Sequence, residues 1–124
     1  MHVAHTALWV ADLNATTAFY EGVLGLDYQW EFTDDDGVVN YYVGTEEGAD
    51  LQFKYDPAGD DDVDPAGIDH VALSVDDLDE TFDRVVAASD CEVVLEPTTF
   101  EAAGRRAGFG TDPDGYVVEF VALV

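Results

Sequence analysis

The sequence predicts an α+β fold in which two βαβββ repeats form a curved, cup-like mixed sheet. Three observations lead to this prediction: a strand-to-helix motif that occurs twice, three strand-like runs after each predicted helix, and turn residues between these runs. The chain has 124 residues, of which 48% are hydrophobic, and this suits one domain with its own core. We therefore expect one domain over residues 1–124, with repeat 1 at 1–56, a linker at 57–66 and repeat 2 at 67–124.

The repeated motif appears when the chain is compared with itself at an offset of 65 residues. His5-Thr6-Ala7-Leu8-Trp9-Val10-Ala11-Asp12-Leu13 aligns with His70-Val71-Ala72-Leu73-Ser74-Val75-Asp76-Asp77-Leu78, and six of the nine positions are identical. Each copy begins as a strand and continues into a predicted helix, Ala15–Leu24 or Leu78–Ser89. Asn14 and Asp79 are the expected N-caps. The alignment makes His5 and His70 equivalent.

Strand-like runs follow each helix. They are Asp27–Phe32, Val38–Val43 and Asp50–Tyr55 in repeat 1, and Glu92–Glu96, Arg106–Gly110 and Tyr116–Val124 in repeat 2. Turns are predicted at Asp34-Asp35-Asp36-Gly37 and Asp112-Pro113-Asp114-Gly115, and the segment Asp56–Gly67 reads as a solvated linker. Because each half would leave one sheet face uncovered, we expect the copies to close on each other, within one chain or between two.

The charge balance excludes several classes of partner. Four Lys and Arg residues stand against 28 Asp and Glu residues, which gives a net charge of −24. Nucleic acids and anionic membranes would repel such a chain, and the apolar run Val117–Val124 is far shorter than the roughly 18 residues of a membrane-spanning helix. We expect no signal peptide. An acidic surface suits molar salt and the lone Cys91 suits a reducing compartment, so the predicted location is the cytoplasm of a halophilic organism.

Glu119 is the first candidate metal ligand. It shares a strand face with the apolar Val117 and Val121, where an unpaired carboxylate would cost several kcal/mol, so a cation or a metal is expected beside it. The run Asp60-Asp61-Asp62, by contrast, lacks the spaced ligands of a calcium-binding loop.

The repeat adds three further candidates. It makes Gln52 equivalent to Glu119, as it makes His5 equivalent to His70, and pseudo-symmetry would bring the four together. Two imidazoles, an amide oxygen and a carboxylate suit Ni²⁺, Co²⁺, Zn²⁺, Mn²⁺ or Fe²⁺. The alternative is that each histidine is an isolated packed residue and that Glu119 pairs with Arg105 or Arg106.

A series of short motifs extends along almost the whole chain. They are His5-Thr6-x-Leu8, Val10-x-Asp12-Leu13, Phe19-Tyr20, Val23-Leu24-Gly25-Leu26, Asp69-His70-Val71-Ala72-Leu73-Ser74-Val75 and Asp112-Pro113-Asp114-Gly115-Tyr116-x-x-Glu119. In this order they resemble the vicinal oxygen chelate superfamily, which is also the glyoxalase-bleomycin resistance-dioxygenase family. Within it they are most similar to the glyoxalase I, or lactoylglutathione lyase, branch.

The resemblance implies a metal-dependent lyase or isomerase that converts the hemithioacetal of a 2-oxoaldehyde and a thiol through an enediolate. It implies one divalent metal ion per site, held at His5, Gln52, His70 and Glu119, and a homodimer in which the site is shared between chains. Glu119 is the expected catalytic base, because it is the one ligand position that can both ionise and carry a proton between adjacent carbons.

The chain departs from this branch at the positions that hold glutathione. The resemblance to bacterial glyoxalase I implies a Glu where this chain has Gln52. It implies an Arg, which holds the glutathione carboxylate, where this chain has Trp9. Ala66 and Gly67 stand where a base would precede the fifth strand, which leaves Lys54, Arg105 and Arg106 as nearby cations. A related thiol, or a substrate without a thiol, is therefore an alternative to glutathione.

Three other functions stay open. The four ligands are also similar to those of methylmalonyl-CoA epimerase, whose second carboxylate would correspond to Asp35 or Asp36. An extradiol-type dioxygenase would use His5, His70 and Glu119 as a facial triad for Fe²⁺ and would leave Gln52 unexplained. The superfamily also holds metal-free antibiotic-binding proteins, whose cup would be lined here by Trp9, Trp30, Tyr41, Tyr42 and Phe109.

Overall fold

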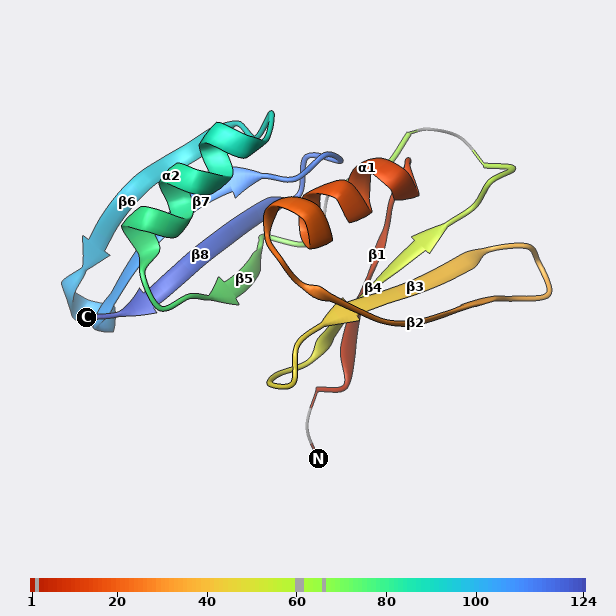
Figure 1. Cartoon of the computed structure of the whole chain (residues 1–124), viewed down its shortest axis with the longest axis horizontal. Helices are drawn as coiled ribbons and strands as arrows, with labels where there is room; N and C mark the ends of the chain where they lie inside the picture. Colours follow the sequence, from red (N-terminus) through yellow and green to blue (C-terminus); the bar gives the residue numbers. More distant parts are fainter. Residues whose placement is uncertain (2, 60–61, 66) are drawn as a thin grey trace. The chain divides into compact units, whose positions relative to one another are not determined.

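The computed structural model of the chain describes residues 1, 3–59, 62–65 and 67–124 (Figure 1). The chain divides into two compact units, Met1–Asp64 and Pro65–Val124, and the boundary falls within the predicted linker. Asp60, Asp61 and Ala66 lie outside the described residues. The predictions made for the acidic run Asp60-Asp61-Asp62 and for the position of Ala66 therefore stay predictions. Closure of the two repeats into one domain stays a prediction.

The first unit contains a mixed sheet with a helical segment on one face. Its described residues form four strands, β1 (His5–Trp9), β2 (Asp27–Thr33), β3 (Val39–Gly44) and β4 (Asp50–Tyr55). The strand order is β1-β4-β3-β2, with β1 parallel to β4 and the other pairs antiparallel. Between β1 and β2 the α-helix α1 (Leu13–Thr17) continues as the π-helix η1 (Ala18–Val23). The ring of Tyr20 lies 4.8 Å from that of Phe53, so this segment packs on the sheet.

The second unit repeats this plan. Over the described part of 65–124, the strands β5 (Val71–Ser74), β6 (Val93–Phe100), β7 (Arg105–Thr111) and β8 (Val117–Leu123) form a sheet of order β5-β8-β7-β6. The helix α2 (Leu78–Ala88) follows β5, and a short 3₁₀ helix, η2 (Glu101–Ala103), joins β6 to β7. The predicted α+β class and the βαβββ order of both repeats are confirmed (Figure 1).

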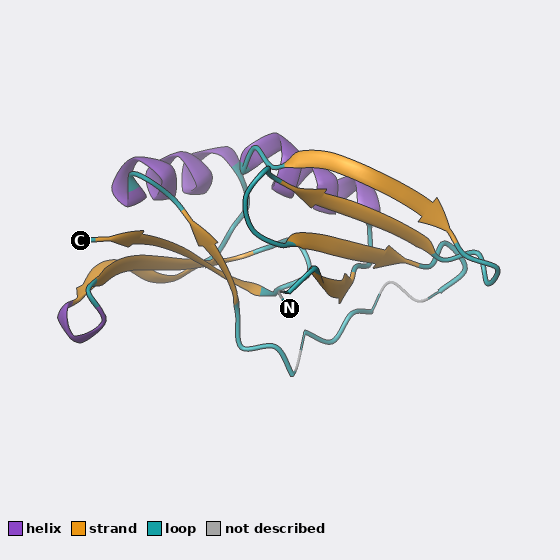
Figure 2. Ribbon diagram, turned by 90° about the horizontal axis from the view of Figure 1, so that it is seen from below, coloured by secondary structure: helices purple, strands orange, loops and turns teal. Residues whose placement is uncertain are grey.

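The helix α2 packs closely on its sheet because β7 carries a glycine beneath it. The Phe82 and Phe120 rings, both buried, lie 6.2 Å apart between α2 and β8. A Cβ at Gly108 would come within 2.8 Å of the Phe82 ring, so any larger residue would displace the helix. This face of the second sheet is therefore occupied by its own helix, as the ribbon view shows (Figure 2).

The predicted N-caps were wrong. The helices begin at Leu13 and Leu78, and the caps are Asp12, which accepts from the Ala15 N–H, and Asp77, which accepts from the Glu80 N–H. An aspartate oxygen reaches the N–H three residues onward, so the residue before each leucine takes the cap position. Asn14 and Asp79, proposed as caps, lie in the first turn instead.

Two element boundaries differ from the prediction by more than two residues. The first helix does not stay α-helical to Leu24, because the π-helix begins at Ala18, with the Leu24 N–H bonded to the Phe19 carbonyl. Strand β6 continues through Pro97 to Phe100 instead of ending at Glu96. Proline fits there because β6 is an edge strand and its register shifts between Leu95 and Thr98.

Candidate functional site

In the first unit, Gln52 lies at the centre of the sheet face opposite the helical segment. It pairs with Ala7 of β1 on one side and with Tyr42 of β3 on the other. His5 is two residues before Ala7, and alternation along the strand therefore places it on the same face as Gln52. The His5 ring packs edge-on against Tyr42, with ring centroids 5.5 Å apart.

In the second unit, Glu119 occupies the equivalent place. It pairs with Ala72 of β5 and with Phe109 of β7. His70 is two residues before Ala72 and packs edge-on against Phe109 at 5.6 Å, as His5 does against Tyr42. His70 was expected inside the fifth strand, but β5 begins one residue later, at Val71.

The two registers match pair for pair. Each unit has a histidine, an alanine two residues later, and a Gln or Glu that pairs with that alanine. This confirms the equivalence of Gln52 with Glu119 that the repeat predicted. Among the described residues, no three His, Cys, Asp or Glu side chains form a group that could hold a metal ion. The meeting of the four predicted ligands therefore stays a prediction.

Two of the predicted ligands, His70 and Glu119, are in direct contact. His70 Nε2 lies 3.0 Å from Glu119 Oε1, and the Glu119 side chain is 17% exposed. On the other edge of the ring, Nδ1 lies 2.7 Å from Oδ2 of Asp69, whose side chain is 97% exposed. The imidazole is thus held between two carboxylates, and its Nε2 edge faces the sheet.

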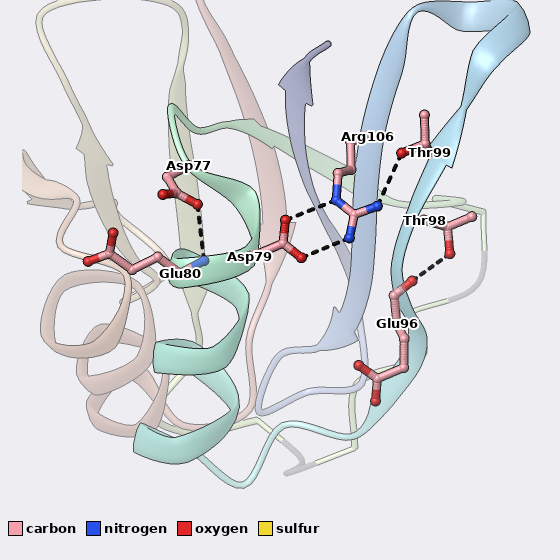
Figure 3. Close-up of polar contacts among 7 residues, drawn as sticks. All are labelled: Asp77, Asp79, Glu80, Glu96, Thr98, Thr99 and Arg106. Atoms are coloured by element: carbon pink, nitrogen blue, oxygen red, sulfur yellow. Dashed lines mark hydrogen bonds and ion pairs between the residues drawn. The ribbon is translucent and has the colours of Figure 1, made fainter.

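The alternative in which Glu119 pairs with an arginine was wrong. Arg106 donates two hydrogen bonds to Asp79, from Nε at 2.9 Å and from Nη2 at 2.8 Å, and a third to the hydroxyl of Thr99 (Figure 3). Arg105 donates to the backbone carbonyls of Ala103 and Gly104. The hydrogen bonds and charge of Arg106 lower the pKa of Asp79.

A buried pair of amides supports Gln52, and sequence reasoning missed it. Gln52 Nε2 donates to Asn40 Oδ1 at 2.8 Å, and Asn40 Nδ2 donates to the Val38 carbonyl at 3.1 Å. Asn40 is 1% exposed and Gln52 is 7% exposed. The signal available in the sequence was a polar residue between the apolar residues of a predicted strand, at a position where repeat 2 has Ala107.

Aromatic rings gather beside Gln52 on the same face. Trp30 stacks on Tyr42 with centroids 4.7 Å apart, and Phe32 stacks on Trp30 at 5.1 Å. Trp30 is 49% exposed and Phe32 is 40% exposed, so this stack is open to solvent in the chain.

The other predicted lining residues divide between the two sheet faces. Lys54 Nζ lies 5.3 Å from the centre of the Trp9 ring, on the Gln52 face. Tyr41 lies on the opposite face and donates to Glu21 of η1 at 2.6 Å. Burial and this hydrogen bond raise the pKa of Tyr41. Tyr41 is therefore not part of an aromatic lining around Gln52.

Asp35 and Asp36 lie at the exposed tip of the β2–β3 hairpin. The turn is built by Asp34, whose Oδ1 accepts the N–H of Asp36 at 2.9 Å and that of Val38 at 3.1 Å. The two carboxylates proposed for an epimerase thus belong to a solvated turn.

No helix in the part of the chain that the structure describes has both the length and the apolar composition needed to cross a membrane.

Comparisons with known proteins agree on one family. The model of the Glyoxalase/Bleomycin resistance protein/Dioxygenase superfamily matches residues 2–120. Lactoylglutathione lyase of Haemophilus influenzae is 31% identical over 127 residues, which cover 98% of this chain and 92% of that protein.

Solved structures with the same fold are also found. Glyoxalase I from Zea mays superposes with a TM-score of 0.84 at 23% identity; the match covers 97% of this chain but 44% of the maize chain, so this chain spans less than half of that protein. TnmS3, an antibiotic binding protein from Streptomyces sp. CB03234, superposes with a TM-score of 0.75 at 22% identity over 100% of this chain and 97% of that one. The fold is the α+β vicinal oxygen chelate fold, and the chain belongs to the glyoxalase/bleomycin resistance protein/dioxygenase superfamily.

Proposed function

We propose that this chain is a metal-dependent, glyoxalase I-like lyase that isomerises the hemithioacetal of a 2-oxoaldehyde and a thiol. The observation that carries the proposal is the matched pair of donors in the two units, His5 with Gln52 and His70 with Glu119. The relatives named lactoylglutathione lyase support it. The proposal includes a homodimer with a shared site, in the cytoplasm of a halophilic organism.

The donor chemistry of the four residues fits one divalent cation. Two donors about 2.1 Å from a metal and at right angles to each other are about 3.0 Å apart. His70 Nε2 and Glu119 Oε1 have this separation, and Nδ1 of His70 lies against Asp69 in the way that a carboxylate orients a ligating histidine. Gln52 would add an amide oxygen and His5 a second imidazole.

The chain's own residues divide the chemistry between them. When bound, a divalent metal supplies Lewis-acid stabilisation of negative charge on the substrate oxygens. Glu119 would remove the proton from one substrate carbon and return it to the next, because a carboxylate titrates and the amide of Gln52 does not. His5, His70 and Gln52 would then hold and orient, without exchanging protons.

Lys54 gives the proposed thiol its most favourable anchor. It pairs with Trp9 across β4 and β1 and follows Gln52 by two residues on the same face. Its ammonium therefore lies beside Trp9, the position at which the resemblance to bacterial glyoxalase I implies an arginine. We assign the Lys54 ammonium to binding a carboxylate of the thiol. An acidic thiol would need such a cation, because the chain has a net charge of −24 and would otherwise repel it.

The exposed rings of Trp30 and Phe32, which stack over the buried ring of Tyr42, favour a second candidate, a metal-free binding protein for flat aromatic molecules. TnmS3, which has a similar fold, is an antibiotic binding protein. The two candidates differ in metal content. A protein purified in molar KCl without bound metal, and unable to take it up, would favour the binding protein.

The test is metal titration followed by a substrate screen. The chelated chain is titrated with Ni²⁺ and Co²⁺ by calorimetry in molar KCl, and then assayed with methylglyoxal and a panel of thiols. We expect one site per chain, weakened at least tenfold by His5→Ala and by His70→Ala. Asp35→Asn, in the hairpin tip, is the control and should bind as the parent does. Parent-like affinity in both histidine variants would remove the proposed site.

A further inference from the structure

We propose that Asn40 is a positioning residue that makes Gln52 present its amide oxygen, and not its amide nitrogen, to the divalent cation. The inference rests on the proposed function, since it concerns one of the four proposed ligands. It assigns a role to a residue that belongs to none of the ligand pairs. It also explains how an amide can take the place of a carboxylate in this site.

The polarity of the amide pair follows from the Val38 carbonyl. A backbone carbonyl can only accept a hydrogen bond, so the side chain of Asn40 must turn its Nδ2 toward Val38, at 3.1 Å. Its Oδ1 then points the other way, and an oxygen without a proton can only accept. Gln52 must therefore offer Nε2, which it does at 2.8 Å. The oxygen Oε1 is left as the atom on the other side of the amide.

Burial allows the hydrogen bond from Gln52 to Asn40 to fix the orientation of the Gln52 amide. Asn40 is 1% exposed and Gln52 is 7% exposed, so water offers little competition for either amide. A glutamine has nearly the same shape when its amide is rotated by half a turn, and packing alone does not separate the two orientations. The rotated amide would direct NH₂ toward the cation, and NH₂ cannot ligate it. A hydrogen-bond partner of fixed polarity is what selects the oxygen.

The second unit provides an internal comparison. There the equivalent ligand is Glu119, and both of its oxygens can accept or ligate, so no orientation has to be selected. The position equivalent to Asn40 is Ala107, since Asn40 pairs with Lys54 two residues after Gln52 and Ala107 pairs with Val121 two residues after Glu119. The amide ligand Gln52 thus has the polar Asn40 as its neighbour. The carboxylate Glu119 has Ala107, with only a methyl group, at the equivalent position.

A double-mutant cycle tests the proposal through Co²⁺ affinity, measured by calorimetry in molar KCl on the parent, Asn40→Ala, Gln52→Glu and the double variant. Asn40→Ala should weaken binding about 10- to 100-fold when residue 52 is Gln, the usual effect of losing a partner that orients a ligand. In the Gln52→Glu background the same change should leave affinity unchanged or improve it, because Asn40 Oδ1 would face a carboxylate there.

The outcomes separate the two proposals. Equal losses in both backgrounds would mean that Asn40 matters only for packing, and no loss in either would mean that it does not orient Gln52; each result overturns the inference. A parent chain that binds no metal overturns the proposed function and this inference together. Asn40→Leu keeps the buried volume and repeats the cycle should the alanine variant not fold, as judged by circular dichroism.

Discussion

Nε2 of His70 lies 3.0 Å from Oε1 of Glu119, so a ring nitrogen and a carboxylate are in direct contact in the second unit. In the first unit, the corresponding positions are His5 and Gln52. The two halves therefore match in register and differ in acid-base chemistry. In the proposed function, the ionisable Glu119 of the second half is the base, and Gln52 of the first half is an uncharged ligand.

Glu119→Gln should abolish most turnover while leaving the metal in place. The amide keeps an oxygen of the same size, so we expect a modest fall in metal affinity, but it cannot accept a proton, so hemithioacetal turnover should fall by roughly two to four orders of magnitude. Steady-state kinetics on the metal-loaded variant measure this. Gln52→Glu is the control and should keep or raise activity. A parent-like rate would place the base elsewhere, with Asp35 and Asp36 next to be tested.

Lys54→Met should raise the KM for an acidic thiol substrate and leave its kcat nearly unchanged. The change keeps the apolar stem beside Trp9 and removes the ammonium that lies 5.3 Å from the ring centre. We expect a KM increase of roughly tenfold for a thiol that carries a carboxylate, and little change for a neutral thiol of similar size. Arg105→Met, on the other unit, is the matched loss of one positive charge. Equal effects on both thiols would show that Lys54 does not bind a carboxylate.

Arg106→Ala should lower the melting temperature in a pH-dependent way. Arg106 binds Asp79 at the start of α2 and lowers its pKa, so the pair stabilises the fold above the ordinary aspartate pKa of about 3.9. The stabilisation is lost as the pH falls through the lowered pKa of the folded state. Thermal melts of parent and variant should therefore differ at neutral pH and converge in acid.

The control for this prediction is Arg105→Ala, which removes the same charge, since Arg105 donates to the backbone carbonyls of Ala103 and Gly104 and not to a carboxylate. Its difference from the parent should not depend on acid pH in this way. A constant gap between parent and Arg106→Ala down to the most acidic melt would mean that Asp79 is not the group involved.

Stability should fall steeply as KCl is lowered below about 1 M. The net charge is −24, and the screening length grows from about 3 Å at 1 M salt to about 10 Å at 0.1 M, so the acidic side chains repel one another more strongly in dilute buffer. Melting temperatures over a KCl series measure the effect. Sucrose at matched osmolarity is the control and should not replace the salt. A midpoint that does not change with KCl would contradict the halophilic interpretation.

The chain should be a homodimer in solution. The edge strands β2 and β6 carry exposed apolar side chains, with Trp30 at 49% and Phe32 at 40% on the first and Val94 at 55% on the second. Such edges are costly to leave open. Light scattering in molar KCl across the micromolar range should give the mass of two chains. The mass of one chain at every concentration would indicate that the repeats close within a single chain.

The fold was predictable because the same βαβββ pattern occurs twice in the sequence. The repeat located β1 and β5, and turn residues such as Gly37 and Gly115, whose φ angles of 84° and 88° suit glycine, located the hairpins. The π-helix η1 was not predictable, since hydrophobic periodicity does not separate it from an α-helix. The caps were misplaced by two residues because several Asp and Asn side chains near each helix start can all serve as caps.

The matched register of the predicted ligand positions was predictable for the same reason, because alignment of the repeats places Gln52 over Glu119. Asn40 was not, since its bond to Gln52 joins neighbouring strands across 12 residues of sequence and has no local pattern. Its role depends on the direction of two amides, which a sequence does not record. The position of His70 just outside β5 likewise depends on where pairing with β8 begins.

Several acidic residues of this protein also stabilise its turns and helix starts. Side-chain oxygens that accept a backbone N–H are found at Asp12, Asp34, Asp56, Asp77 and Asp112. Aspartate is short enough to reach an N–H two to four residues onward, which makes it a turn former as well as a charge. Lysine at these positions would remove the turn as well as the charge, whereas asparagine would remove the charge and keep a side-chain oxygen that accepts the backbone N–H.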